Sequence, residues 1–148
     1  MQELRKGGLL VAQIHQLAGR IFARKLKQAN IHEINPAQGR ILFALWEQDG
    51  ISVSELSSKT LLEKSTLTAM LDRLEEAGFI MRIPAEGDRR KTIVLRTEKD
   101  KAFQETYIKV SAEMLELFYH GFSTEEVDVF EESLARILAN LRAGDNEK

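Results

Sequence analysis

The stretch from Lys64 to Leu95 constrains the fold more strongly than any other part of this 148-residue chain. Its first half, KSTLTAMLDRLEEAGFI, carries leucine and methionine at helical spacing and reaches a glycine, Gly78, that is typical of a left-handed helix stop. Its second half alternates apolar and polar residues in two runs, 79–83 and 92–96, around a loop with proline, glycine and charges. The stretch therefore predicts a short amphipathic helix followed directly by a β-hairpin.

The polar residues of this helix and hairpin are typical of a DNA-reading unit. The helix starts with basic and hydroxyl side chains, and the hairpin loop is rich in arginine. A helix of this size fits the major groove, and a basic hairpin tip reaches a neighbouring minor groove. The residues predicted to contact DNA are Lys64, Ser65, Thr66, Thr68 and Arg73 of the helix, and Arg89, Arg90 and Lys91 of the hairpin.

Each of these side chains also has a more ordinary interpretation. Serine and threonine at a helix start can act only as caps. Arg73 can pair with Asp72 or Glu76 on the surface of its own helix. Arginines at a hairpin tip can be solvated without any partner, although their clustering favours contact with phosphate or a DNA groove.

Two further helix starts precede this unit. Asn35-Pro36-Ala37-Gln38 combines an N-cap residue, a proline at the first helical position and a glutamine at the capping-box position. Ser52-Val53-Ser54-Glu55 is a second capping box, which opens a short helix to about Lys59. A tight turn joins the short helix from Ser52 to the helix from Lys64, so these two form a helix-turn-helix. The hairpin that follows makes it winged. We expect Trp46 to be a core residue.

Long amphipathic patterns lie at both ends of the chain. They predict a helix over 9–29, a second over 97–120, and a third that begins with a capping box at Ser123. Since these helices exceed what a winged helix needs, we expect a homodimer, whose two-fold axis matches a palindromic site; a bundle within a monomer is the alternative. The expected organisation is a single, mainly α domain with dimerisation helices (1–30 and 98–148) and a winged helix-turn-helix lobe (35–97).

Charge and composition limit the remaining classes of protein. The formal net charge is −2, but residues 59–96 carry 8 Lys and Arg against 6 Asp and Glu, whereas residues 97–148 carry 6 against 12. A DNA-binder of this kind makes few phosphate contacts, so its affinity should be moderate and salt-sensitive. The sequence has no cysteine, no apolar run near the roughly 20 residues of a membrane span and no signal-peptide core. We therefore expect a soluble, cytoplasmic protein.

The sequence offers no motif for catalysis. The three histidines, His15, His32 and His120, lack the spacing of metal ligands. Neither a nucleophile elbow nor a phosphate-cradling glycine loop is present. The expectation is a protein that is not an enzyme and has no metal or other cofactor.

The chain resembles the MarR family of transcriptional regulators over nearly its whole length. The segments that carry the resemblance are NPAQGRILFAL from Asn35, SVSELSSKT from Ser52, and the helix from Lys64. The most diagnostic feature is Asp88-Arg89-Arg90 at its spacing before Val94-Leu95. The resemblance implies a homodimeric winged helix-turn-helix regulator, often a repressor that leaves DNA on binding a small phenolic or lipophilic effector. It assigns Arg90 to the minor groove and Asp88 to holding that arginine in place. The family often has arginine where this chain has Ala69, so base preference does not transfer.

An effector crevice between the dimer helices and the DNA-binding lobe would draw on the first helix. Its candidate residues are His15, Gly19 and Phe22, and the alternative for His15 is a core or interface histidine. Two other functions remain open from the sequence. One is a protein-interaction module without DNA binding, and the other is a DNA-binding activator without an effector.

Overall fold

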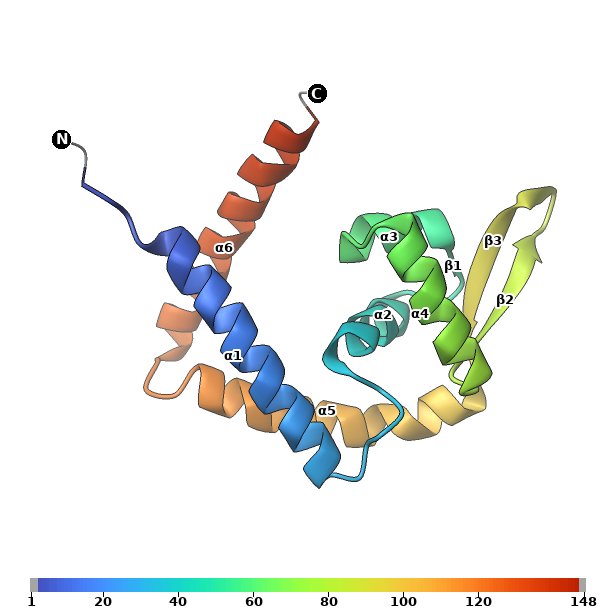
Figure 1. Ribbon diagram of the computed structural model, residues 1–148, viewed down its shortest axis with the longest axis horizontal. Coiled ribbons are helices and arrows are strands. Elements are labelled where there is room, and N and C mark those ends of the chain that lie inside the picture. Colours follow the sequence, from blue (N-terminus) through green and yellow to red (C-terminus); the bar gives the residue numbers. More distant parts are fainter. Residues whose placement is uncertain (1–2, 147–148) are drawn as a thin grey trace. The chain divides into compact units, whose positions relative to one another are not determined.

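The computed structural model describes residues 3–146 and shows a mainly helical chain with a small antiparallel sheet (Figure 1). This confirms the predicted fold class, a winged helix-turn-helix flanked by terminal helices. The chain divides within its fifth helix into two compact units, Met1–Ala112 and Glu113–Lys148. The elements are α1 (Gly7–Gln28), α2 (Pro36–Glu47), β1 (Ile51–Ser52), α3 (Val53–Thr60), α4 (Lys64–Glu76), β2 (Ile80–Ala85), β3 (Asp88–Arg96), α5 (Glu98–Phe118) and α6 (Thr124–Asp145).

Both predicted capping boxes of the first unit are present. The Asn35 side chain accepts a hydrogen bond from the Gln38 backbone N–H at 2.8 Å, and the Gln38 side chain accepts one from Asn35 N–H at 3.0 Å. Ser52 and Glu55 make the same reciprocal pair at the start of α3. These bonds satisfy backbone donors that a helix start leaves unpaired, and thereby fix where α2 and α3 begin.

The end of α4 follows the predicted left-handed stop. Gly78 has φ of +88°, a conformation that side chains with a Cβ rarely adopt. Its N–H bonds to the Glu75 carbonyl at 3.0 Å, and Phe79 N–H bonds to the Leu74 carbonyl at 2.9 Å. This closing turn directs the chain immediately into β2, so the wing (β2 and β3) starts at a fixed point beside α4, the predicted DNA-recognition helix.

One hydrophobic core holds the winged helix together. The apolar stripes of α2, α3 and α4 meet the inner faces of β2 and β3, and the central leucine and isoleucine side chains have an exposed fraction of 2% or less. Burial of one such side chain contributes about 1.5–3 kcal/mol. The fully buried members include Ile41, Leu42, Leu45, Leu56, Leu67, Leu71, Leu74, Ile80 and Val94.

The sheet differs from the prediction in two respects. Its strand order is β1-β3-β2, and β1, which pairs Ile51 with Val94, was not predicted. Strand β1 has only two residues and therefore shows no periodicity in the sequence; it is a strand only because it pairs with β3. The hairpin strands are also longer than predicted, since β2 extends through Pro84 and β3 begins at Asp88. Pro84 is tolerated because β2 is an edge strand with an irregularity at that point.

The second unit contains the end of α5 and the whole of α6. Ser123 caps α6 with the predicted capping box, accepting from Glu126 N–H at 3.1 Å. Tyr119 packs edge-to-face against Phe118, Phe122 and Phe130, with ring centroids 5.0–6.1 Å apart. The apolar stripe of α6 remains exposed in the single chain, for example 51% at Ile137 and 66% at Leu141.

Candidate nucleic-acid interface

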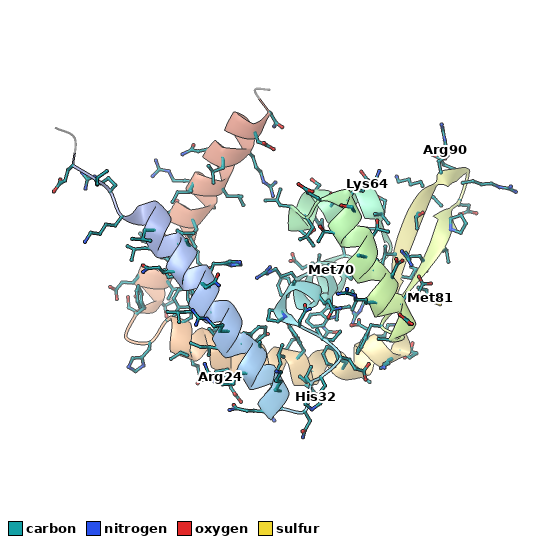
Figure 2. All side chains as sticks on the ribbon, viewed as in Figure 1. Arg24, His32, Lys64, Met70, Met81 and Arg90 are labelled. Carbon is teal, nitrogen blue, oxygen red and sulfur yellow. The ribbon has the colours of Figure 1, made fainter. Side chains whose placement is uncertain are left out.

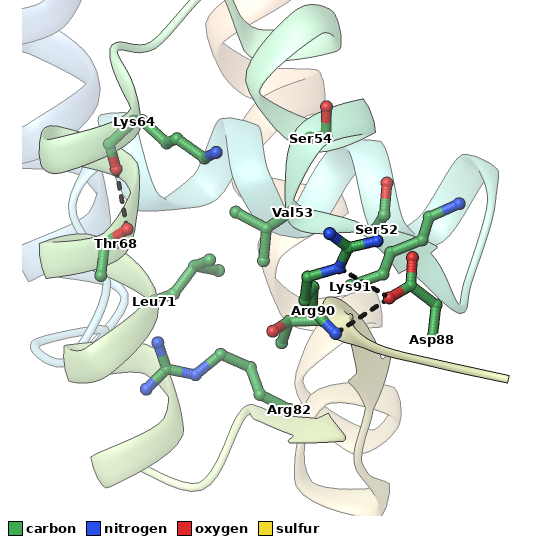
Figure 3. Close-up of a pocket in the computed structure, with 11 residues that line it drawn as sticks. Ser52, Val53, Ser54, Lys64, Thr68, Leu71, Arg82, Asp88, Arg90 and Lys91 are labelled. Atoms are coloured by element: carbon green, nitrogen blue, oxygen red, sulfur yellow. Dashed lines mark hydrogen bonds and ion pairs between the residues drawn. The ribbon is translucent and has the colours of Figure 1, made fainter. Parts of the chain in front are cut away.

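A groove lies between the start of α3, the exposed flank of α4 and the wing strand β3 (Figure 3). Its volume is about 460 Å³. It brings residues of the recognition helix and of the wing, separated by some twenty positions in sequence, to the walls of one cavity. The lining side chains are Ser52, Val53, Ser54, Lys64, Thr68, Leu71, Arg82, Asp88, Arg90, Lys91 and Thr92.

The start of α4 presents unpaired backbone donors to solvent. Its N-cap residue is Glu63, and within residues 3–146 no side chain caps it. Ser65 and Thr66 follow this N-cap within α4 and are exposed; because the helix start has no side-chain cap, the interpretation of these hydroxyls as helix caps is wrong. The Thr68 hydroxyl donates to the Lys64 carbonyl at 2.8 Å, which leaves its oxygen free to accept. A helix start with free N–H groups carries partial positive charge and favours an anion such as a phosphate.

The wing tip carries Arg90, whose backbone is fixed by Asp88 and whose side chain extends into solvent. The Asp88 carboxylate accepts from Arg90 N–H at 3.0 Å, and its Oδ1 lies 3.6 Å from Arg90 Nε. Figure 2 shows Arg90 projecting from the tip, with Lys64 at the start of α4; the Arg90 side chain is 95% exposed. The contact expected between Asp88 and Arg90 is therefore present, with the guanidinium in solvent. Arg89 and Lys91 are exposed beside it.

Arg82 is a groove residue that the sequence analysis missed. It ion-pairs with Asp72 and Glu75 of α4, so the predicted alternative partner for Arg73, Asp72, is engaged elsewhere. Arg73 itself is exposed on α4. Burial alone would lower the pKa of Arg82, but the hydrogen bonds that it donates to Glu75 and Asp72, together with their negative charges, outweigh burial and raise the pKa above its usual value. The sequence does carry a signal for this role. In the alternating run Ile80-Met81-Arg82 the arginine shares the inward face with Ile80, where a cation needs an anionic partner.

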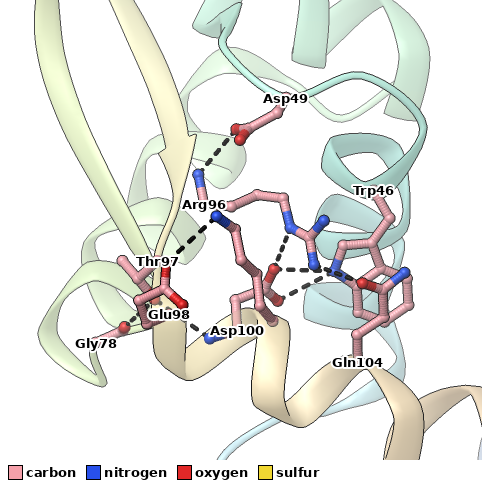
Figure 4. A network of polar contacts seen from close by, with 9 residues as sticks. Trp46, Asp49, Gly78, Arg96, Thr97, Glu98, Asp100 and Gln104 are labelled. Carbon is pink, nitrogen blue, oxygen red and sulfur yellow. Dashed lines mark hydrogen bonds and ion pairs between the residues drawn. The ribbon is translucent and has the colours of Figure 1, made fainter.

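A buried polar network anchors the base of the wing (Figure 4). Asp100, at 0% exposure, accepts from Trp46 Nε1 and from Arg96 Nε. Arg96 also donates from Nη2 to Gln104 at 2.6 Å and from its backbone N–H to Asp49 at 2.9 Å. Because Arg96 is the last residue of β3, these bonds join the wing to α2 and to the start of α5. Trp46, expected in the core, is half-buried against it.

Comparison with known proteins identifies the family. The sequence profile of the MarR family matches residues 34–92. YsmB, an uncharacterized HTH-type transcriptional regulator of Bacillus subtilis strain 168, is 33% identical over 109 residues, which are 73% of this chain and 74% of YsmB. The chain belongs to the MarR family. The resemblance read from the sequence is thus confirmed.

Other known proteins match over different lengths. TtmR of Methylorubrum extorquens strain PA1, an HTH-type transcriptional regulator, is 36% identical over 73 residues; the match spans 49% of this chain but only 37% of TtmR. A crystal structure of MarR is similar over 95% of this chain and 99% of that chain, with a TM-score of 0.74 and 26% identity. The structure of overoxidized AbfR bound to DNA gives a TM-score of 0.71 and 25% identity, over 90% of both chains.

The candidate effector residues lie on α1 in different environments. Phe22 packs edge-to-face on Tyr107 of α5, with ring centroids 5.6 Å apart. Gly19 is half-buried and His15 is exposed in the single chain. An effector crevice at these three residues stays a prediction.

Residues 3–146 contain neither a candidate metal site nor a candidate membrane span. No group of three or more His, Asp or Glu side chains in this range is arranged to hold a metal ion. No helix in the same range has the length and apolar character that crossing a membrane requires.

Proposed function

We propose that this MarR-family protein is a sequence-specific DNA-binding transcriptional regulator that acts as a repressor. The observation that carries the proposal is the shared groove, whose walls hold Lys64 and Thr68 of the recognition helix together with Arg90 and Lys91 of the wing. A helix in the major groove and a wing tip in the adjacent minor groove straddle one phosphate strand, which would lie along such a groove.

The proposed contacts divide between the two elements. Lys64, Ser65, Thr66 and Thr68 bind phosphates and base edges from the start of α4, where free backbone N–H groups favour an anion. Arg90 enters the minor groove, whose negative potential favours a guanidinium, while Asp88 fixes the backbone of the tip. The remaining proposed contacts come from Arg73, Arg89 and Lys91, which are exposed.

We propose that the regulator is a homodimer on a palindromic operator. On α1, five large apolar side chains from Leu9 to Leu17 are 43–62% exposed, and on α6 the stripe from Leu134 to Leu141 is 37–66% exposed. Apolar faces of this extent favour a partner surface, and a second copy supplies one with two-fold symmetry. In this proposal 1–30 and 98–148 are the dimerisation segments and 35–97 is the DNA-binding lobe.

Similar proteins support this function. TtmR and YsmB are named HTH-type transcriptional regulators, and the structural neighbour AbfR has been solved bound to DNA. We accordingly propose a protein that works on the chromosome in the cytoplasm and performs no catalysis. A small aromatic or lipophilic effector that binds the DNA-incompetent spacing of the two recognition helices more tightly would release it, with His15, Gly19 and Phe22 as candidate contacts.

The test measures binding of the wild-type protein and of Arg90→Ala to the same duplex at several salt concentrations. We expect wild-type affinity to fall steeply with salt, and Arg90→Ala to weaken binding by about tenfold and to reduce the salt slope by about one. Arg24→Ala removes an equal charge from α1, away from the wing in Figure 2, and should bind like wild type. An absence of saturable DNA binding at low salt would instead favour a protein-interaction module.

A further inference from the structure

Arg82 joins the wing to the recognition helix. Within residues 3–146, the side-chain hydrogen bonds from β2 or β3 to α4 are those of this one residue. Its Nε donates to Glu75 Oε1 at 2.7 Å, and its Nη2 donates to Asp72 Oδ1 at 2.6 Å. Each branch of the guanidinium therefore holds a different carboxylate, and with 24% of its side chain exposed Arg82 is better fixed than a free surface arginine.

The strand pattern explains why an arginine can occupy this position. Ile80 is buried and Met81 is exposed, so Arg82 returns to the face of β2 that looks toward α4. Figure 3 shows its side chain reaching from the strand toward the helix. On α4, Asp72 and Glu75 lie three residues apart on one flank, where two carboxylates repel each other unless a cation stands between them.

The ion pairs lie below the groove walls that carry the proposed DNA contacts. Arg82 lines the same groove as Lys64 of α4 and Arg90 of the wing. The hairpin is anchored at its base and free at its tip, so a small rotation near Arg82 becomes a larger displacement of Arg90. Loss of the two hydrogen bonds of Arg82 therefore changes the distance between the two DNA-contacting elements.

We propose that Arg82 is a positioning residue for DNA binding, which sets the spacing between α4 and the wing tip through Asp72 and Glu75. The inference rests on the proposed DNA-binding function. The role proposed for Arg82 differs from that of Arg90, because Arg82 acts through the two carboxylates and not through a phosphate contact.

The sharpest test removes the carboxylates and keeps the arginine. Asp72→Asn with Glu75→Gln takes two negative charges off the recognition helix, so electrostatics alone predicts tighter binding to every duplex. Positioning predicts that affinity for the duplex selected by the wild-type protein falls about tenfold while affinity for unrelated DNA rises. If affinity for both duplexes rises together, the inference is wrong.

Substitutions of Arg82 itself give an independent measurement. Arg82→Gln should weaken binding to the selected duplex by about tenfold with an unchanged salt slope. Arg82→Lys should bind with an affinity between those of Arg82→Gln and wild type, since an ammonium lacks the rigid planar fork that reaches Asp72 and Glu75 in fixed directions. A salt slope reduced by about one in Arg82→Gln would show a direct phosphate contact and overturn the positioning role. Circular dichroism and Trp46 fluorescence establish that each variant is folded; if Arg82→Gln is not, the double carboxylate variant decides.

The outcome for the wild-type protein separates the two proposals. If wild type binds no duplex saturably, the proposed function fails and this inference fails with it. If wild type binds and Arg90→Ala weakens binding, but the Arg82 and carboxylate variants bind like wild type, only the positioning role is lost.

Discussion

Trp46 Nε1 donates hydrogen bonds to both carboxylate oxygens of Asp100, at 3.1 and 3.0 Å, although the two residues lie 54 positions apart. The carboxylate has no exposed surface, and Arg96 Nε reaches it at 2.5 Å. A buried charge is tolerated only when it is paired and hydrogen-bonded, and here three donor contacts meet that need. The base of the wing, the end of α2 and the start of α5 are thus fixed at one point.

Asp100→Asn should destabilise the fold by about 3 kcal/mol, because it leaves the largely buried Arg96 guanidinium without its counter-charge. Urea denaturation followed by Trp46 fluorescence measures the change. The matched control is Glu98→Gln in the same helix turn. Its carboxylate is 93% exposed and pairs with Lys101 at 3.4 Å, so the control should lie within about 0.5 kcal/mol of wild type. Equal stability of the two variants would contradict the role given to Asp100.

Gly39→Ala should destabilise the protein by about 3 kcal/mol. A Cβ at this position would lie 1.8 Å from Tyr107 Oη and 2.5 Å from its Cζ, so the buried Tyr107 ring would have to shift out of its packed position. Gly144→Ala in α6 is the control, since its Cβ would meet nothing within 4 Å and should stabilise the helix by about 0.5–1 kcal/mol. Thermal unfolding of both variants shows whether each substitution lowers or raises the stability of the protein. A neutral Gly39→Ala would contradict the close contact between Gly39 and the Tyr107 ring.

Leu61→Gly should stabilise the protein by about 1 kcal/mol. Leu61 ends α3 in a left-handed conformation, with φ of 59° and ψ of 22°, which strains a residue with a Cβ. Its side chain is 60% exposed, so little packing is lost with it. The control Ser58→Gly, in the exposed middle of the same helix, should cost about 0.5–1 kcal/mol. Denaturant midpoints that move in the same direction for both variants would argue against strain at Leu61.

Stability should fall as pH rises from 10 toward 12. Burial raises the pKa of Tyr107 to about 12, against the opposing effect of Arg40, while the unfolded chain keeps the ordinary value of 10.0. In this window the unfolded state releases the phenolic proton and the native state retains it, so the change favours unfolding by up to about 2–3 kcal/mol. Tyr107→Phe should remove this component. If denaturation at pH 9 and pH 11.5 shows the same loss in both proteins, Tyr107 is not its source.

Local sequence signals predicted much of the fold. The capping boxes at Asn35, Ser52 and Ser123 and the stop at Gly78 depend on residues within a few positions of one another, so the pattern alone located these helix ends. The groove-lining residues of the helix start and wing were also predicted. Their contacts with DNA remain predictions, as do those of an effector with α1.

The features that sequence missed depend on distant partners. Pairing of Ile51 with Val94 creates β1, and the ion pairs of Arg82 with α4 depend on how the hairpin folds back. A pattern of charges cannot tell which carboxylate a given arginine contacts. For the same reason the alternative partners proposed for Arg73 were Asp72 and Glu76. Trp46 packs against the core as expected, but its hydrogen bonds to Asp100 were not predicted, because no local signal shows which side chain lies opposite the indole N–H.

The central claim is that two copies of this helix and wing read one palindromic site, and selection of bound duplexes from a genomic or random pool tests it most directly. We expect enrichment of an inverted repeat whose half-sites are about 10 base pairs apart, centre to centre. The Arg90→Ala variant should lose this enrichment. Recovery of no sequence above the unselected pool, at salt low enough for non-specific binding, would contradict it.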